Sequence, residues 1–375
     1  MYIKFIFLFL LLFILYIIFK IINKKKSDIR YFKCKLDDGK THFTKILKNT
    51  LMVNKIKKSS FKKSNLYLPC KYTTVENELK SYSFDNNKII FSINGCDNVV
   101  SKAKLWTIIS SKYGRRKASK IMPETFLTDS DINEFKKRYK KNKLYILKNK
   151  LQRKEGIYLT KDYNFLINSE KNGYTIIQDY IKNVFLINNR KLNIRIYTVI
   201  ICYKNIFNCY IYNNGKCIYT NSDYNYKSKD LHSHITSLDL DLKIYEKNPL
   251  TLHELKSYMI KNKLNYDKLW TNVNKCIKKA THAFKKYLYT DEKFKNNLSF
   301  QIFGPDIIVD EKLNCFIAEI NKGPSMKFEL FKDNKLKTNL YLDTFKLIEQ
   351  FCRTNDIYRF FKNLKGDHKN FIKLI

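Results

Sequence analysis

The chain has 375 residues, which is long enough for two or three domains or for one large unit with additions. Its 72 Lys and Arg against 34 Asp and Glu give a net charge of +38, which favours polyanionic partners, although lysine-rich coding alone would produce the same excess. The nine cysteines form no C-x-x-C pair, which argues against a zinc site or a redox motif and indicates reduced, buried thiols.

The N-terminal residues form a long apolar segment. The stretch "YIKFIFLFLLLFILYIIFKII" is interrupted only by Lys4 and Lys20 near its ends, and its length matches the hydrocarbon core of a bilayer. No small-residue cleavage site follows it, so a removed signal peptide is the weaker interpretation. The positive-inside rule then places the rest of the chain in the cytoplasm. The sequence predicts a single-pass membrane anchor over residues 1–23.

The remaining chain divides into a basic linker and a globular region. Residues 24–65 are rich in Lys and Ser and are predicted to form a mostly exposed connection beside the membrane. From residue 66 the composition becomes that of a folded region, which we expect to extend over 66–375.

Periodicity and turn residues predict the elements of this region. In chain order they are helices over 104–114 and 129–142, strands over 143–149, 156–161, 174–181, 193–203 and 206–220, helices over 251–262 and 266–289, two strands from 300 to 321, and a helix over 340–353. The run Asn213-Asn214-Gly215 is typical of a hairpin turn. Antiparallel signals without regular βαβ alternation predict the α+β class.

Two apolar runs near the C-terminus, "FQIFGPDIIVD" and "CFIAEIN", contain Asp306, Glu319 and Asn321. In an antiparallel hairpin with residues 311–314 as the loop, Asp306 lies opposite Glu319, and Asn321 leaves the same face. Facing carboxylates repel each other, and a bound divalent cation removes that repulsion. Two acids and an amide suit Mg²⁺ better than Zn²⁺. The alternative is that Asp306 caps a turn and Glu319 is a solvated charge on an edge strand.

Three further features would suit a nucleotide. Lys148 ends a predicted strand and precedes a loop containing Gly156, which could hold phosphates through charge and backbone N–H groups. The strand around 176–181 could present its backbone to an adenine. Lys191 and Arg195 are four residues apart, so they share a face of an extended strand. Each feature alone is equally compatible with an ordinary solvated strand end.

These elements occur in a recognisable order. The stretches "LYILK…GI", "QDYI", "RKLNIRIY", "HITS", "FGPDIIVD" and "FIAEINKGPS" together resemble the tubulin–tyrosine ligase family of ATP-grasp ligases, over about residues 100–330. The "EINKGPS" element, preceded by "FGPD", is the most specific part. The resemblance implies an ATP-grasp fold that holds ATP between two α+β subdomains, with residues 66–142, 143–185 and 186–375 as its N-terminal, central and C-terminal parts.

The resemblance also implies an activity and a set of site residues. The family attaches an amino acid, such as tyrosine or glutamate, to a protein carboxylate through an acylphosphate, using ATP and Mg²⁺, commonly on an acidic tubulin tail. Carried over position by position, the resemblance implies that Lys148 holds phosphates and that the adenine is bordered by Gln178, Tyr180 and Ile181. It implies that Lys191 and Arg195 contact the nucleotide and are catalytic, and that His234 and Thr236 line the pocket. It also implies that Mg²⁺ is bound by Asp306, Glu319 and Asn321. We expect a monomer whose partners are a free amino acid, an acidic protein tail and the membrane, with no specific nucleic acid, because the charge is accompanied by no nucleic-acid recognition motif.

The chain departs from the family pattern around this pocket. It has Asn149 where a proline is usual, Asp179 for a lysine, Asn193 for an aspartate and Ile218 for an arginine. These departures leave a second hypothesis open, in which a catalytically impaired ligase fold tethers a membrane to microtubules or another acidic partner.

Overall fold

The computed structural model describes residues 13, 30–33, 45–86, 88–149, 156–355, 357 and 369–375. The predicted anchor over residues 1–23 lies outside this part, apart from Phe13. A membrane-spanning helix needs about 20 mostly apolar residues, and no helix among the described residues has the length and apolarity to cross a bilayer. The prediction of a single-pass, membrane-anchored chain with a cytoplasmic catalytic region is therefore withdrawn.

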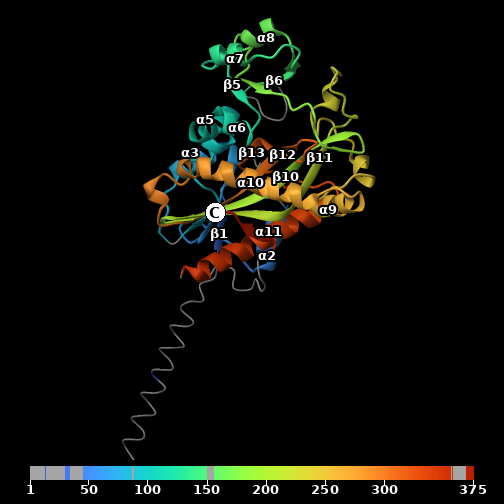
Figure 1. The fold of residues 1–375 in the computed structure, drawn as a ribbon. Coiled ribbons are helices and arrows are strands. Elements are labelled where there is room, and N and C mark those ends of the chain that lie inside the picture. Colours follow the sequence, from blue (N-terminus) through green and yellow to red (C-terminus); the bar gives the residue numbers. More distant parts are fainter. Residues whose placement is uncertain are drawn as a thin grey trace, which may run out of the picture.

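A large sheet forms the centre of the molecule (Figure 1). Its order is β14-β11-β10-β12-β4-β3-β1-β2, with β13 paired to β12 and β9 to β10. The strands are β1 (Arg30–Lys33), β2 (Lys57–Lys58), β3 (Leu66–Leu68), β4 (Ile89–Ile90), β9 (Leu186–Ile187), β10 (Arg190–Tyr203), β11 (Ile206–Tyr219), β12 (Leu298–Val309), β13 (Cys315–Asn321) and β14 (Phe371–Lys373).

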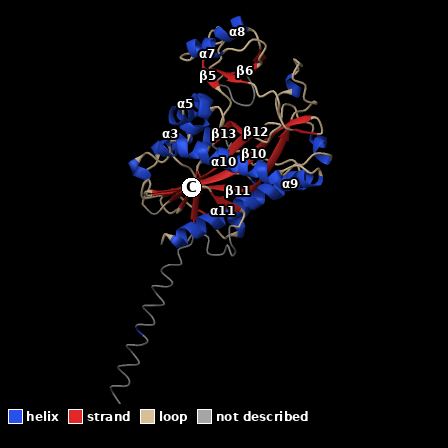
Figure 2. Cartoon of the chain, in the orientation of Figure 1, coloured by secondary structure: helices blue, strands red, loops and turns tan. Residues whose placement is uncertain are grey.

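Helices cover both faces of this sheet (Figure 2). Because successive side chains on a strand point to opposite faces, β10 contributes Ile194 and Ile200 to one apolar core and Val199 and Ile201 to another. The first core also contains residues of α5 (Lys102–Tyr113), α9 (Leu252–Lys261) and α10 (Tyr266–Phe284). The second contains residues of α2 (Lys45–Val53) and α11 (Phe331–Thr354). The functional candidates on β10 and β12 lie on the α11 face.

A second, four-stranded sheet lies above the large one (Figure 1). It consists of β5 (Thr125–Leu127), β6 (Tyr145–Lys148), β7 (Ile157–Thr160) and β8 (Ile176–Asp179) in the order β5-β8-β6-β7. One face packs a core that includes Phe135 of α7 (Ile132–Arg138) and Leu166 of α8 (Tyr163–Ile167). The other face carries Ile146 and a small cluster that contains Tyr180. The two sheets confirm a mixed α and β fold.

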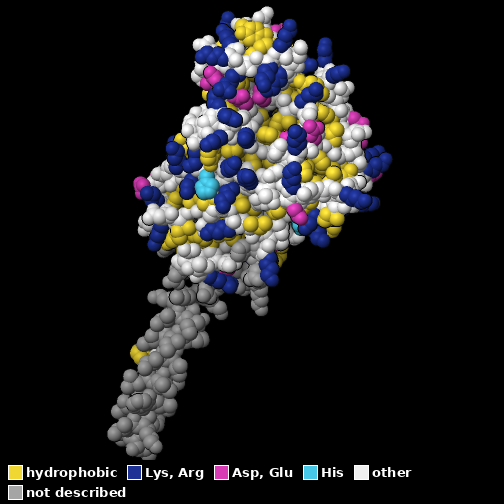
Figure 3. Space-filling view, in the orientation of Figure 1, with side chains coloured by type: hydrophobic (Ala, Val, Ile, Leu, Met, Phe, Trp, Pro, Cys, Tyr) yellow, Lys and Arg dark blue, Asp and Glu magenta, His cyan; other side chains and the backbone are white. Residues whose placement is uncertain are grey.

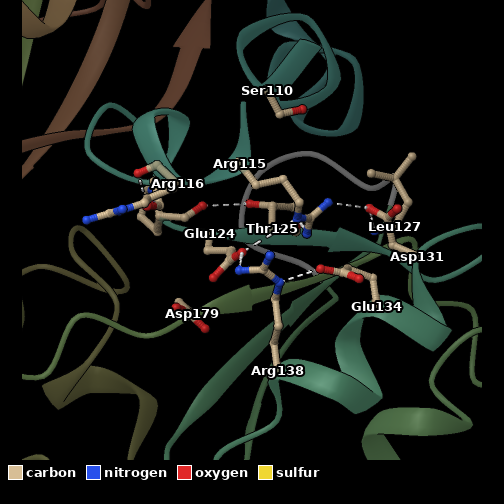
Figure 4. A network of polar contacts seen from close by, with 12 residues as sticks. Ser110, Arg115, Arg116, Glu124, Thr125, Leu127, Asp131, Glu134, Arg138 and Asp179 are labelled. Atoms are coloured by element: carbon tan, nitrogen blue, oxygen red, sulfur yellow. Dashed lines mark hydrogen bonds and ion pairs between the residues drawn. The ribbon is translucent and has the colours of Figure 1, made fainter. Parts of the chain in front are cut away.

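Arg115 in α6 (Arg115–Ala118) connects the small sheet to the body (Figure 4). Its guanidinium donates to the carbonyl oxygen of Thr125 at 2.8 Å and forms ion pairs with Glu124 at 3.5 Å and Asp131 at 3.3 Å. Arg138 adds a second ion pair to Glu124 at 3.5 Å. The start of β5 is thereby fixed against α6, which gives the small sheet a defined position next to α5.

The predicted basic linker over residues 24–65 is wrong for the part that the structure describes. Residues 30–33 form β1, which pairs in parallel with β2 and β3. Residues 45–53 form α2, whose Ile46, Leu47 and Leu51 are buried in the core shared with α11. The abundance of lysine hid the helical spacing of these apolar residues, which pack on the sheet.

The cysteine prediction holds at seven positions and fails at one. Cys96, Cys202 and five further cysteines are free and buried, and burial raises the pKa of both named thiols. Cys70 is disulfide-bonded, so the thiols are not uniformly reduced as expected.

The predicted turn at Asn213-Asn214-Gly215 is also wrong. The chain reverses instead at Lys204 and Asn205, because Tyr203 pairs with Ile206. Gly215 lies inside β11 at an irregularity, and a Cβ placed on it would overlap the carbonyl oxygen of Arg195. The glycine is needed for this close approach of two strands, which places Arg195 in its register.

Replacement of Gly215 by alanine is expected to destabilise the protein by about 1–3 kcal/mol, because the new methyl group must displace backbone. The measurement is the free energy of unfolding from urea denaturation. Asn208→Ala, on the same strand away from the irregularity, serves as the control and should change stability by about 0.5 kcal/mol or less. Equal stability of the Gly215 variant and the wild type would contradict the close approach.

Candidate active site

A row of charged side chains crosses four strands on the α11 face of the large sheet. Lys216 pairs with Arg195, Arg195 with Asp306, and Asp306 with Glu319. Direct cross-strand partners project from the same face of a sheet, so two cations and two carboxylates lie side by side. The predicted pairing of Asp306 with Glu319 is confirmed.

The route to this pairing differs from the predicted hairpin. Close to the turn, Val309 pairs with Cys315, one residue out of the expected register. An irregularity after Asp306 accommodates one extra residue on β13 and restores the expected pairing from Asp306 onward. The loop correspondingly begins at Asp310, whose N–H donates to the carbonyl oxygen of Asn314 at 3.0 Å.

The glycines of "FGPD" and "NKGPS" allow the chain segments around Asp306 and Glu319 to pack closely. A Cβ on Gly304 would lie 2.8 Å from Pro324 and 3.0 Å from Cδ of Arg195. One on Gly323 would enter the ring of Tyr72. The two motifs are therefore in direct contact, and their small residues make room for the arginine side chain that reaches Asp306.

Asp306 and Arg195 form a two-pronged ion pair. Nη2 of Arg195 donates to Oδ2 of Asp306 at 2.8 Å, and Nε donates to Oδ1. Both carboxylate oxygens of Asp306 are thus engaged. Burial raises the pKa of Asp306 despite the adjacent guanidinium. Burial acts to lower the pKa of Arg195, but the carboxylate of Asp306 outweighs this effect, and the pKa of Arg195 is raised.

Glu319 contacts a different cation. Nζ of Lys102 lies 3.3 Å from Oε2 of Glu319, and Nδ2 of Asn321 donates to Oε1 at 3.3 Å. Burial alone would raise the pKa of Glu319, but Lys102, Lys148 and Arg195 together lower it. The carboxylate of Glu319 is consequently held in its charged form.

The sequence did not identify Lys102 as a residue of this site. This lysine occupies the first turn of α5, after the N-cap Ser101, and no acidic residue lies in that turn. A cation at a helix N-terminus opposes the helix dipole. This unfavourable placement is a usable signal, because it suggests that the lysine serves an anion outside its own helix.

Lys148 and Gln178 face the row from the small sheet. Nζ of Lys148 donates to Oε1 of Gln178 at 2.8 Å, and Nε2 of Gln178 donates to Oγ1 of Thr125 at 2.8 Å. Burial and the nearby Lys102 lower the pKa of Lys148 to about 8, although Glu319 opposes this effect. The lysine predicted to hold phosphates is therefore buried beside other cations.

Lys191 lies in a second polar cluster. Its Nζ donates to the carbonyl oxygen of His234 at 3.0 Å and to the hydroxyl of Tyr180 at 3.4 Å, which in turn is 2.8 Å from Nδ1 of His234. Burial, assisted by Lys148, lowers the pKa of Lys191 to about 7. Burial also lowers the pKa of His234, so this cluster favours neutral side chains until an anion arrives.

The other predicted positions border these clusters. Nδ2 of Asn193 donates to Oγ1 of Thr236 at 3.0 Å, and Ile181 is partly exposed directly after Tyr180. The predicted phosphate loop falls largely outside the described residues, which omit 150–155. At its end, the N–H of Asn149 donates to the carbonyl oxygen of Gly156 at 3.1 Å.

Two departures from the family pattern are neighbours in the structure. Asn193 and Ile218 pair directly across β10 and β11. An acid and a base at these two positions would face each other, so their joint replacement removes one negative and one positive charge. The net charge of the pocket is unchanged by the two departures together.

Nucleotide binding at pH 8 is expected to be accompanied by uptake of about one proton or more, because phosphates raise the lowered pKa values of Lys191 and Lys148. ATP affinity should consequently fall as pH rises above about 7, where free Lys191 begins to lose its proton, and further above about 8, where Lys148 does. Calorimetry in buffers of different ionisation enthalpy measures the uptake. Lys191→Met should reduce it by about one proton, whereas the control Lys268→Met, at an exposed lysine of α10, should not. Uptake that is unchanged in the Lys191 variant would contradict this assignment.

Taken together, the fold and the polar row describe a two-sheet protein with buried cations next to paired carboxylates. The sequence model of the tubulin-tyrosine ligase family matches residues 78–356. The chain belongs to the tubulin-tyrosine ligase family.

Its similarity to individual proteins is more distant. It is 24% identical over 268 residues to a probable beta-tubulin polyglutamylase of Tetrahymena thermophila, which covers 63% of this chain and 22% of that protein. It is 27% identical over 249 residues to tubulin polyglutamylase ttll6 of Danio rerio, covering 61% and 31%. It is 24% identical over 257 residues to tubulin polyglutamylase TTLL5 of Homo sapiens, covering 63% and 20%. The chain thus spans less than a third of the length of each of these relatives.

Proposed function

We propose that this protein is an ATP-dependent ligase with an ATP-grasp fold that joins an amino acid to a carboxylate of an acidic, tubulin-like protein tail. The observation that carries the proposal is the row Arg195–Asp306–Glu319, faced by Lys148 from the second sheet. Phosphoryl transfer depends on positioning and on stabilisation of charge by cations. Buried lysines with lowered pKa values are suited to this role, since a bound phosphate supplies the negative charge that they lack.

The ligand set of the carboxylate corner fits Mg²⁺. Asp306 and Glu319 offer hard carboxylate oxygens, and Asn321 uses its Nδ2 on Glu319 and on the carbonyl oxygen of Gly304, which leaves the amide oxygen for an ion. Magnesium bound there would neutralise phosphate charge and orient the γ-phosphate. Because both oxygens of Asp306 accept from Arg195, we expect the ion to compete with this guanidinium.

In the proposed reaction, a carboxylate oxygen of the acceptor attacks the γ-phosphorus of ATP, the bond to the β-phosphate oxygen breaks, and ADP leaves. The amine of the second substrate then attacks the carbonyl carbon of the acylphosphate, loses a proton and expels inorganic phosphate. Lys148 and Lys191 hold the nucleotide phosphates. Arg195 stabilises the negative charge that develops on the transferred group, from its position beside Asp306. Gln178, Tyr180 and Ile181 border the adenine, and His234 and Thr236 complete the pocket.

Glutamate is the amino acid that we favour, because the matched relatives carry polyglutamylase names. The Lys and Arg side chains that are spread over the visible face of the molecule, among far fewer Asp and Glu, suit an acidic acceptor (Figure 3).

The proposal is tested by incubating the full chain with Mg·ATP, tubulin and either glutamate, tyrosine or glycine, followed by mass spectrometry of the tubulin tails. A mass increase with glutamate alone is the expected result. A mass increase with tyrosine or glycine would support the ligase function but would show that the transferred amino acid is not glutamate.

A second function is favoured by one observation. The closed Asp306–Arg195 pair, together with the altered residues Asp179, Asn193 and Ile218, suits a ligase fold that binds an acidic partner without turnover. Asp179 forms an ion pair with Lys143 at 2.6 Å, and as an acid it supplies no positive charge to a phosphate. Co-sedimentation with microtubules in the absence of nucleotide, with no mass increase for any donor, would support this alternative.

A further inference from the structure

The charged row does not end at Arg195. Lys216, its direct partner on β11, extends the row away from Asp306 and Glu319. The side chain of Lys216 is 21% exposed, so part of it is accessible from outside the core. A ligand at Lys216 would lie beside Arg195, on the side opposite the carboxylate corner.

Lys216 belongs to a buried cluster with an unbalanced charge, formed by Lys216, Asp333 and Lys337. Nζ of Lys216 lies 2.9 Å and Nζ of Lys337 2.8 Å from the same oxygen, Oδ2, of Asp333. The other oxygen, Oδ1, is buried and has no hydrogen-bond partner among the residues that the structure describes. Two ammonium groups therefore share one oxygen of one carboxylate, and the cluster carries one uncompensated positive charge.

Among the described residues, Asp333 is the acid that acts on Lys337, and the other charged groups that act on it are cations. Lys337 also donates to the carbonyl oxygen of Lys327. Burial lowers the pKa of Lys337, and Lys216 and Arg195 lower it further, against the effect of Asp333. Asp333 lies in the first turn of α11, whose N-cap, Leu330, has no side-chain hydrogen bond, and a helix N-terminus also favours negative charge. A buried surplus of positive charge is costly unless an anion neutralises it.

We propose that Lys216, held in place by Asp333 and Lys337, binds a carboxylate of the free amino acid that this protein transfers. The inference rests on the proposed ligase function and deepens it. Phosphates belong to the other side of Arg195, where Lys148 and the paired carboxylates lie. A carboxylate on Lys216 places the amino acid beside the acyl carbon that Arg195 stabilises, which is where its amine has to attack.

The test compares Lys216→Met with Lys216→Arg and with Lys332→Met as the control. Lys332 is an exposed lysine of α11, the helix that carries Asp333 and Lys337, and it pairs with Glu254. Loss of a hydrogen-bonded charge is expected to raise the KM for the amino acid by about tenfold to a hundredfold, with little change in the KM for ATP or tubulin. Lys216→Arg should largely restore the wild-type value. Because Lys337 still neutralises Asp333, Lys216→Met should fold.

Binding without turnover provides a second readout. In the presence of Mg²⁺ and a non-hydrolysable ATP analogue, glutamate should raise the melting temperature of the wild type but not of Lys216→Met. Glutamine and isoglutamine, which each lack one of the two carboxylates, identify the group that is bound. If glutamate is ligated and Lys216→Met leaves its KM unchanged, the subsite is overturned while the ligase stands. A rise confined to the KM for ATP, or to that for tubulin, would equally overturn it. If the wild type ligates no amino acid, the proposed ligase function is wrong. The difference in thermal shift between the wild type and Lys216→Met then tests the amino-acid subsite by itself.

Discussion

Glu319→Gln is expected to reduce the affinity for Mg·ATP by about 100-fold or more, since the loss of even an indirect partner of a metal ligand costs about 10–100-fold. The substitution removes one negative charge from the proposed magnesium ligands and keeps the shape of the side chain. Glu319 is 35% exposed and its partner Lys102 is 27% exposed, and an ion pair of this kind contributes only about 0–1 kcal/mol to stability. The fold should therefore persist. Calorimetric titration with Mg·ATP measures the effect.

Glu311→Gln is the matched control, because Glu311 lies in the loop of the same hairpin, where its Oε1 accepts a hydrogen bond from Nδ2 of Asn183 at 2.9 Å. Its Mg·ATP affinity should equal that of the wild type. Asp306→Asn is a less suitable test, because it leaves the partly buried Arg195 guanidinium without its counter-charge, which is itself expected to destabilise the fold. Undiminished binding by Glu319→Gln, with Mg²⁺ still required, would exclude Glu319 as a metal ligand.

Arg195→Lys is expected to lower the rate of ligation by about 100-fold or more, the usual cost of removing a preorganised donor from a developing negative charge. Lysine keeps the positive charge beside Asp306 but lacks the planar fork of donors that holds both carboxylate oxygens and leaves further N–H groups for the transferred phosphoryl group. Affinity for Mg·ATP should change much less than the rate. The measurement is kcat for tail modification together with the dissociation constant of Mg·ATP.

Arg353→Lys serves as the control for this substitution. Arg353 forms an ion pair with Glu349 near the end of α11 and is 49% exposed, and its replacement should leave kcat unchanged. If Arg195→Lys weakens the binding of Mg·ATP and leaves kcat unchanged, Arg195 binds ground state and transition state equally, and its catalytic role is wrong.

Much of the local structure was predictable because it depends on short-range patterns. Thr251 begins α9 with a complete capping box to Glu254, and Gly114 ends α5, both as the sequence indicates. The helical spacing of Leu269, Val273 and Ile277 correctly predicted α10. Where a signal has two structural uses, the prediction failed: Asn213-Asn214-Gly215 suits a turn, but Gly215 is needed in mid-strand because Arg195 approaches it closely.

The sequence by itself determined the family, the mixed α and β class and the pairing of Asp306 with Glu319, because the order and alternation of these residues survive in a one-dimensional pattern. Only the tertiary structure decided which cations serve these carboxylates. Arg195 was an expected nucleotide contact but closes on Asp306, Lys102 reaches Glu319 from a distant helix, and Lys216 joins Asp333 and Lys337. Such pairings depend on which strands and helix ends become neighbours. A chain with 72 basic residues gives no local indication of the few that become buried beside an acid.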